Sequence, residues 1–306
     1  MKNLILKQKM MEKVLLALVP IIFFSVFLFG WRILAVLLVS NVFAFFMEYL
    51  FVRKKKPGKV TTAVFVTGTL LALTLPPPIP FWIAAVGAVV AVCFGKMVFG
   101  GFGMNVFNPA IVGRTFIYIS FPNAMTVNWL NPFISLPGGF AAWLNVDAVT
   151  SATPISIFNQ TGRMESLTSL FTGTIAGSMG ETSALLIMLA GIYLIFTRTA
   201  KWQPILSLLI SFSFFTLIFY QTNPLPFLLS GGLLFGAVFM ITDPVSMPKN
   251  AAAIWIYGIL VGFLTVFIRR YSLFTEGFMF ALLLANTFLP IIEFALNRSK
   301  VKKNGK

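Results

Sequence analysis

Hydroxyl side chains gather in one polar connection of a chain that is otherwise strongly apolar. Residues 147–154, with the sequence DAVTSATP, place Thr150, Ser151 and Thr153 after the carboxylate of Asp147. A run of small hydroxyl residues in a loop is usually plain solvated polypeptide. Composition therefore assigns no chemistry to this segment, and only the spacing Asp-x-x-Thr-Ser-Ala-Thr sets it apart.

Several kinds of redox and hydrolytic site are excluded by what the sequence lacks. It contains no histidine and one cysteine, Cys93, which lies in an apolar segment. Haem bound by histidine is excluded, as is an iron–sulfur cluster built from this chain alone, because such clusters take about four thiolates. The usual nucleophilic triads need a histidine base, and we find no phosphate-binding loop or metal-ligand spacing. We predict no catalytic residue and no metal site, so any redox centre is organic or belongs to a partner.

An arginine inside an apolar run needs a partner. Arg114 lies in the predicted span 106–121, where an ionised side chain costs about 2.5–3.5 kcal/mol on insertion scales. Asp243, which ends a broken span, and Glu181, which opens another, are candidates for the counter-charge. The sequence does not choose between them.

Two further stretches carry polar groups at membrane depth. Residues 100–114, GGFGMNVFNPAIVGR, offer the amides of Asn105 and Asn108, although their glycines equally suit close helix packing. Residues 177–183, GSMGETS, open a span with hydroxyl groups and Glu181. That pattern suits a capped helix start as well as an anion or cofactor site.

Composition places the chain in the membrane. Hydrophobic residues make up 58% of its 306 residues, charged residues only 10%, and the mean hydropathy is +0.92. These values indicate a polytopic membrane protein. The net charge of +15 sits mostly in short runs beside apolar spans, which is typical of loop charge and not of a nucleic-acid surface.

We predict an all-α fold with about ten transmembrane helices in a single integral membrane domain, 1–306. A spanning helix needs roughly 17–25 apolar residues. The candidate spans are 14–30, 33–52, 62–75, 81–98, 106–121, 181–196, 205–220, 227–241, 251–268 and 273–296. Residues 122–179 form one long loop between spans 5 and 6, and 297–306 form a basic tail.

Loop charge predicts the orientation. Of the 23 Lys and Arg residues, 18 fall in segments that lie in the cytoplasm if both termini do. Arg32, Arg163, Arg269 and Arg270 fall outside, and Arg114 falls in a span. Because cytoplasmic loops carry an excess of basic residues, we expect both termini inside and the 122–179 loop outside the cytoplasm.

The two halves of the chain share a short pattern. Residues 67–71, TGTLL, are echoed by 230–234, SGGLL, and both spans end at proline. Two halves, 14–121 and 180–296, would then form inverted five-helix repeats whose interrupted helices meet near the bilayer centre. A small residue followed by Gly-x-Leu-Leu is also common in membrane helices, so the pattern alone leaves the repeat open.

Four segments together resemble a known family. Residues 100–122, 147–156, 177–185 and 239–248 are similar, in this order, to signatures of the D subunit of the Rnf electron-transport complex and of its homologue, the B subunit of the sodium-pumping NADH:quinone oxidoreductase. The resemblance covers essentially the whole chain. The chain resembles the Rnf subunit more closely, because its first span begins near the N-terminus and its residues TSATP match the sequence of the motif in that subunit. Ala148-Val149, where that form often has Gly-Ala, occupies variable positions.

The resemblance implies a covalent cofactor. In this family a flavin transferase esterifies FMN through its phosphate onto the last threonine of the motif, here Thr153, after reading Asp147, Thr150, Ser151 and Ala152. A flavin tethered outside the membrane needs no complete binding domain, and the protein contributes position and electronic tuning. A second, non-covalent flavin such as riboflavin is left open.

The resemblance also implies a complex in a prokaryotic cytoplasmic (inner) membrane. Such a complex passes electrons between ferredoxin and NAD and couples them to sodium or proton movement. Its other subunits and the flavin transferase would be the partners, with no nucleic acid. Arg114, Asn105, Asn108, Glu181 and Asp243 are the weaker candidates for flavin or ion contacts, and a flavin phosphate becomes a third candidate counter-charge for the arginine.

Three other functions stay open. The chain resembles the B-type component of the sodium-pumping quinone oxidoreductase almost as closely. A channel or transporter without flavin would also use inverted five-helix repeats and polar groups in broken helices. A purely structural subunit would leave the spacing from Asp147 to Thr153 unexplained.

Overall fold

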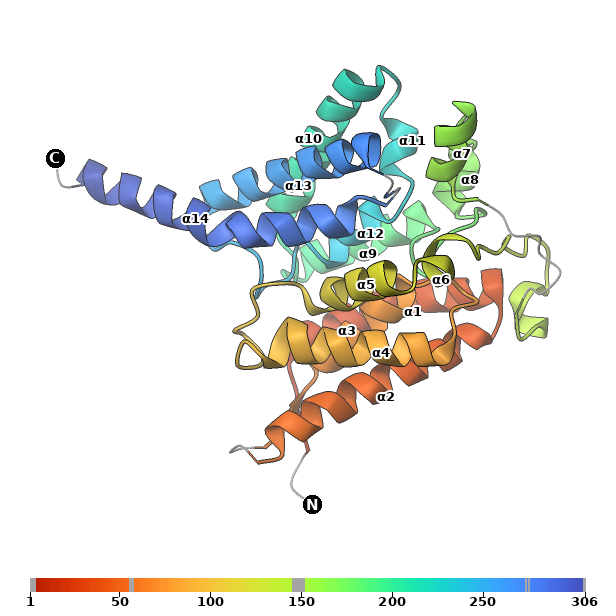
Figure 1. Ribbon diagram of the computed structural model, residues 1–306, viewed down its shortest axis with the longest axis horizontal. Helices are drawn as coiled ribbons and strands as arrows, with labels where there is room; N and C mark the ends of the chain where they lie inside the picture. Colours follow the sequence, from red (N-terminus) through yellow and green to blue (C-terminus); the bar gives the residue numbers. More distant parts are fainter. Residues whose placement is uncertain (1–3, 55–57, 145–151, 273, 275, 305–306) are drawn as a thin grey trace.

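The computed structural model describes residues 4–54, 58–144, 152–272, 274 and 276–304 (Figure 1). The first part of the chain forms five longer helices, with one short parallel strand pair. In order, its elements are β1 (Ile5–Leu6), α1 (Lys9–Phe29), α2 (Arg32–Val52), β2 (Val60–Thr61), α3 (Ala63–Leu73), α4 (Phe81–Val92), which continues as the π-helix Cys93–Met97, and α5 (Pro109–Ser120).

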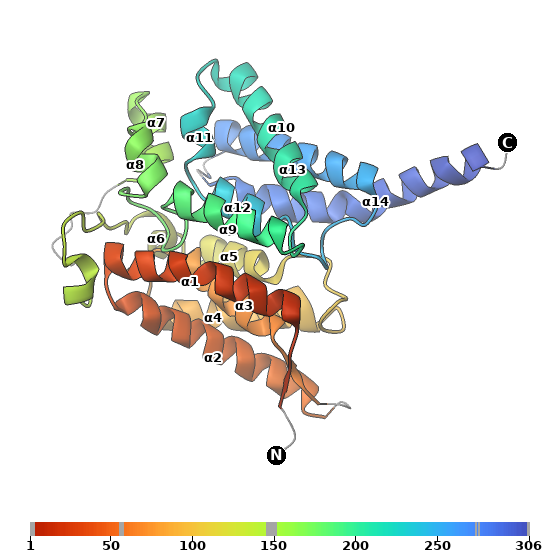
Figure 2. The ribbon, with the colours of Figure 1, turned by 180° about the vertical axis from the view of Figure 1, so that it is seen from behind.

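A polar connection with short helices follows, and then a second group of longer helices. The connection holds α6 (Pro122–Thr126), a 3-10 turn (Gly138–Ala141), α7 (Pro154–Thr161) and α8 (Leu167–Thr172). The second group is α9 (Ala184–Phe196), α10 (Trp202–Tyr220), α11 (Leu225–Leu228), α12 (Leu233–Phe239), α13 (Ala251–Tyr271) and α14 (Phe278–Asn304). Figure 2 shows α1 beside α9, where the two groups meet, and α5 also packs against α14.

Length and composition agree with a polytopic membrane protein. Five helices of the described ranges, α1, α2, α10, α13 and the Phe278–Arg298 part of α14, are long and apolar enough to cross a bilayer. Three more apolar helices, Ala63–Leu73, Phe81–Met97 and Ala184–Phe196, are shorter. Many of their outward side chains are large, apolar and exposed, as expected where lipid is the solvent.

The predicted span 227–241 is wrong as a single helix. Gly231 and Gly232 adopt left-handed backbone angles, with φ of 65° and 67°, and divide it into α11 and α12. Only glycine adopts this conformation without a steric cost. The same kind of interruption ends α3 at Leu73, before the prolines at 76–78.

Two arginines, Arg269 buried and Arg32 half-buried, satisfy the carbonyl groups that these breaks expose. The Arg269 guanidinium donates to the carbonyls of Phe227, Ser230 and Gly231 at 2.9–3.3 Å. The Arg32 guanidinium donates to the carbonyl of Ile79 at 2.7 Å and to that of Pro77, in the break after α3. Backbone groups freed at membrane depth need such partners. This explains why these two arginines depart from the loop-charge rule.

The strand pair is a small departure from the all-α prediction. Ile5 pairs in parallel with Val60, and Leu6 with Thr61. Beyond it, the side-chain oxygen of Gln8 accepts from the amide of Ala63 at 3.1 Å, at the first turn of α3. The N-terminal segment is thereby fixed to the start of the short helix α3.

A buried ion pair, which the sequence analysis missed, ties α4 to α2. The Lys96 ammonium, on the π-helix, lies 2.6 Å from a carboxylate oxygen of Glu48 and donates to the Thr61 hydroxyl at 2.7 Å. Thr61 in turn donates its amide and hydroxyl to the other oxygen of Glu48 at 2.9 and 2.8 Å. Both charged side chains are almost fully buried, at 2% and 1% exposure.

Replacing Lys96 with methionine is expected to destabilise the chain strongly. The variant leaves Glu48 buried without its counter-charge, which typically costs about 3–5 kcal/mol. Thermal unfolding in detergent should show a large fall in midpoint. The double variant Lys96→Met with Glu48→Leu should recover part of it, and Lys201→Met, at an exposed site, should change little. A midpoint for Lys96→Met equal to that of the wild type would contradict the ion pair's structural role.

Candidate functional site

Thr153 begins a helix at the edge of the polar connection. It is the N-cap of α7, with extended backbone angles, and its hydroxyl oxygen accepts from the amide of Ser156 at 3.4 Å. Pro154 follows at the first helical position, where its missing N–H costs nothing. Thr153 and Ala152 are both half-buried. The other three motif residues, at positions 147, 150 and 151, lie outside the described residues.

Thr153 borders a small cavity. Its volume is about 20 Å³. It is lined by Trp129, Ile155, Gly177, Ser178, Glu181, Gly231, Gly232 and Glu276, among others. These residues come from the polar connection, from the segment before α9, from the break before α12 and from the turn between α13 and α14. The cavity therefore lies where several distant parts of the chain converge.

The floor of this site is a buried cluster of charges. Arg114 of α5, only 4% exposed, pairs with both carboxylate oxygens of Glu181 and with Glu276, and its Nη2 also lies 3.4 Å from the Ser178 hydroxyl. Among the partners that the sequence left open for the arginine, the structure provides Glu181. Asp243 lies in a different cavity. Glu276 is a second carboxylate that the sequence analysis did not identify.

Backbone hydrogen bonds carry Glu181 to the end of α3. The amides of Met179 and Gly180 donate to the carbonyls of Leu75 and Leu73 at 3.0 and 2.7 Å. They satisfy carbonyls that the last turn of α3 leaves free. A β-carbon at Gly180 would lie 2.7 Å from that of Leu73, so only glycine permits this approach. The segment GSMGE acts as a cap that delivers its carboxylate to the arginine.

The turn between α13 and α14 delivers Glu276. Phe274 packs edge-on against Tyr118 of α5, with ring centroids 5.7 Å apart, and against Phe280 at 4.6 Å. Burial raises the pKa of Glu276 to about 7; Arg114 opposes this rise and the charge of Glu181 adds to it. The Glu276 carboxyl therefore binds a proton more readily than an ordinary glutamate does.

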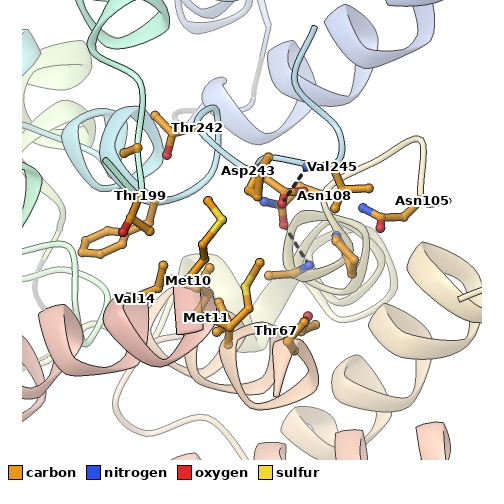
Figure 3. A pocket seen from close by; sticks show the side chains of 18 of the residues that line it. Met10, Met11, Val14, Thr67, Asn105, Asn108, Thr199, Thr242, Asp243 and Val245 are labelled. Atoms are coloured by element: carbon orange, nitrogen blue, oxygen red, sulfur yellow. Dashed lines mark hydrogen bonds between the residues drawn. The ribbon is translucent and has the colours of Figure 1, made fainter. Parts of the chain in front are cut away.

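Asn105, Asn108 and Asp243 share a second cavity (Figure 3). Asn108 caps α5, accepting from the amide of Ala110 at 3.0 Å, and donates to the carbonyl of Met240 at 3.3 Å. Its amide therefore joins the start of α5 to the end of α12. The cap alone explains why an asparagine suits this position.

Asp243 is held by the loop that follows α12. Its carboxylate accepts from the Ser246 hydroxyl at 2.8 Å and from the amide of Val245 at 3.4 Å, and Asn105 lies beside it. Burial raises the pKa of Asp243. The cavity, which also reaches Lys96, has a volume of about 60 Å³. That is room for a few water molecules or an ion, and it is too small for a flavin ring.

One short helix links the two clusters. Asn108 caps the start of α5 and Arg114 lies six residues further along, which is roughly 9 Å along a helix axis. The structure thus brings together Arg114 with Glu181, and Asn105 and Asn108 with Asp243, as two neighbouring sites.

Comparison with known proteins identifies the family. The model of the NQR2, RnfD, RnfE family matches residues 2–302. The chain belongs to this family. It is 36% identical to the D subunit of the sodium-translocating ferredoxin:NAD(+) oxidoreductase complex of Acetobacterium woodii, over 97% of this chain and 92% of the relative. It is also 36% identical to the D subunit of the proton-translocating ferredoxin:NAD(+) oxidoreductase complex of Clostridium ljungdahlii, over 93% and 88%.

A second group of relatives within the NQR2, RnfD, RnfE family is similar to nearly the same degree. The chain is 35% identical to the B subunit of the Na(+)-translocating NADH-quinone reductase of Pseudomonas aeruginosa, over 88% of this chain and 68% of the relative. Membership of the family is therefore shown, as the four sequence segments indicated.

Two of the missed residues left signals in the sequence. Glu276 fell inside the predicted span 273–296, where a carboxylate is as costly as Arg114 is in its own span. Lys96 likewise lay at the end of the predicted span 81–98, although we assigned it to a cytoplasmic segment. Searching the spans for charges of both signs would have found Glu276 and Lys96.

Proposed function

We propose that this chain is the membrane subunit of an ion-translocating electron-transport complex and carries FMN esterified to Thr153. The relatives are named as subunits of such complexes. The observation that carries the flavin proposal is the spacing from Asp147 to Thr153. Its support in the structure is a half-buried hydroxyl at a helix start beside a charged cavity.

The residues around Thr153 fit a phosphate ester. The first turn of α7 presents backbone amides, such as that of Ser156, and a helix N-terminus favours an anion. Esterification replaces the hydroxyl hydrogen and leaves the oxygen able to accept. When bound, the flavin supplies one- and two-electron chemistry, while the chain fixes its position.

The flavin ring does not fit in this small cavity, since about 20 Å³ holds only one or two water molecules. A larger cleft of about 180 Å³ adjoins this cavity and shares Pro154, Ile175 and Ala176 with it. Its lining mixes apolar and polar residues, including Asn131, Ile134, Ala152, Ile157, Glu165 and Thr174. We assign the ring to this larger cleft, where a carrier on a neighbouring subunit could approach it.

Mass spectrometry tests the covalent cofactor directly. The chain is made in cells that contain the flavin transferase, and the mass of the peptide that includes Thr153 is measured. We expect an added mass equal to FMN less one water. A peptide at its bare mass from such cells would remove the redox role and leave a permease as the better explanation.

We infer that the helices form two inverted repeats of five, α1–α5 and α9, α10, α12, α13 and α14. The supporting observation is that equivalent helices pack alike. Helix α2 packs on α4 as α10 does on α13, α4 on α5 as α13 does on α14, and α1 on α3 as α9 does on α12. Each half also has one short interrupted helix whose free carbonyls an arginine satisfies.

Both termini are cytoplasmic in this proposal, and the loop with Thr153 is extracytoplasmic. Cysteine labelling tests it in a Cys93→Ala background. Gln160→Cys and Lys201→Cys place single thiols at exposed sites on the two expected sides. An impermeant maleimide should label the first in intact spheroplasts and the second only after lysis. Labelling of both, or of the second alone, before lysis would contradict the orientation.

We propose ferredoxin:NAD oxidoreduction as the activity of the complex, with a quinone reductase as the alternative. Relatives of both kinds are nearly equally similar. The choice between the two activities therefore depends on the residues TSATP of the motif. The coupled ion would pass near α5, whose start borders the Asp243 cavity and whose middle carries Arg114. A permease without flavin would use the same polar groups, and the mass of the Thr153 peptide separates the two.

A further inference from the structure

Two carboxylates converge on one guanidinium beside Thr153. Glu181 and Glu276 both pair with Arg114, so the three side chains carry a net negative charge when all are ionised. A second arginine, Arg269, is close enough to influence Glu276, but its guanidinium donates to the backbone carbonyls of the break before α12. The cluster therefore has two carboxylates and one guanidinium that pairs with both, so one negative charge is left over.

Glu276 is the carboxylate that water can reach. Its side chain is 12% exposed, against 6% for Glu181, and it lies on the turn between α13 and α14, outside the helices. Glu181 is instead fixed by the cap on α3 and takes two of the guanidinium hydrogen bonds. The groups that face Glu276 are Arg114 on α5, Glu181 before α9 and Arg269 on α13, and Tyr118 of α5 lies beside Arg114.

The geometry also relates this carboxylate to the flavin attachment. Thr153, Glu181 and Glu276 line the same cavity of about 20 Å³. Room for a water molecule there gives a proton a short path between the carboxyl group and the surface. The cleft assigned to the flavin ring shares Pro154, Ile175 and Ala176 with this cavity, so protein separates a charge on the ring from Glu276, and the two charges interact in a medium of low dielectric constant.

We propose that Glu276 is a proton-binding site that compensates the charge of an electron delivered to the flavin on Thr153. The inference rests on the proposed function. A one-electron carrier of a neighbouring subunit, an iron–sulfur or flavin group, is oxidised as the electron arrives. A proton from extracytoplasmic water then forms an O–H bond on the Glu276 carboxylate, and the net charge at the site is unchanged. When the electron leaves, this bond breaks and the proton returns to water.

The reduction potential of the bound flavin tests the coupling. The flavinylated protein is titrated with dithionite from about pH 6 to about pH 8, either side of the Glu276 pKa of about 7, and compared with Glu276→Gln. A neutral amide resembles the protonated carboxyl. The two potentials should coincide at the acid end, and at the alkaline end the Glu276→Gln potential should lie above that of the wild type. A constant offset at every pH would indicate a structural effect and overturn the proposal.

A second measurement needs no flavin. Infrared difference spectra of the Thr153→Val chain between acid and alkaline pH should show carbonyl absorption of protonated carboxyl groups, and Glu276→Gln in that background should lose the Glu276 band while the absorption of Asp243 remains. Glu165→Gln, at an exposed site, should retain the Glu276 band. If the Glu276 band is absent, the proton site is wrong whether or not the flavin is present. If the band is present but the wild type carries no flavin, the proposed function and the coupling fall together.

Discussion

Replacing Arg114 with methionine is expected to unfold most of the chain under conditions where the wild type is folded. Methionine removes the one cation that Glu181 and Glu276 share. Breaking a buried pair by removing one partner typically costs about 3–5 kcal/mol, and here two carboxylates lose their counter-charge. That is a large part of the roughly 5–15 kcal/mol that holds a typical domain together.

The measurement is the thermal unfolding midpoint in detergent, together with the yield of monodisperse protein. Arg163→Met, at an exposed site in the polar connection, is the matched control and should behave as the wild type. The triple variant Arg114→Met with Glu181→Gln and Glu276→Gln should recover much of the lost stability, because neither carboxylate of the cluster is then left without its counter-charge. An Arg114→Met protein with the wild-type midpoint would contradict this prediction, because it would mean that water solvates the two carboxylates once the guanidinium is gone.

The Arg114→Met defect should also depend on pH. Without the guanidinium, burial disfavours the charged form of both carboxyl groups. Folding of the variant then requires proton uptake at Glu276, whose pKa burial raises, so stability rises as the pH falls through that pKa. A midpoint that improves from about pH 8 to about pH 6 in the variant, and not in Arg163→Met, would support this.

Local residue chemistry predicted a mostly helical membrane chain and the ends of some of its helices. Prolines at 76–78 ended α3 as expected, because a helix cannot continue through them. The sequence Asp243-Pro244 follows α12 in the same way. The break at Gly231–Gly232 was harder to predict, because glycine is also common in continuous membrane helices and only the fold shows which role it has.

The charged side chains show where sequence reasoning stopped. The cost of a charge in a span correctly implied that Arg114 needs a partner. Which partner it has depends on the cap that carries Glu181 to α3 and on the turn that carries Glu276, and both are tertiary features. The loop-charge rule likewise could not foresee that Arg269 is used inside the fold, because that rule counts charges without asking which carbonyls need donors.

The flavin itself gives the sharpest expected result. In cells that contain the flavin transferase, Thr153→Val should abolish covalent flavin completely, since valine has a similar shape and no oxygen to esterify. After a denaturing gel, the wild-type band should fluoresce under ultraviolet light, because a covalent ester survives denaturation, and the variant band should be dark. Absorbance of the precipitated protein gives the stoichiometry.

Folding must be separated from modification in this experiment, because Thr153 also caps α7. Losing an N-cap costs about 0.5–2 kcal/mol, and here the cost falls on a helix of eight residues at the surface of the protein. The Thr153→Val chain should therefore keep its unfolding midpoint.

Thr161→Val is the matched control. This threonine lies at the other end of α7, is exposed, and its hydroxyl donates to the Ile157 carbonyl within the helix at 2.8 Å. A fluorescent Thr153→Val band would place the flavin on another residue, whereas a dark band in both variants would point to a folding defect of α7. A dark band for Thr153→Val alone, from protein of unchanged stability, would identify that hydroxyl as the attachment site.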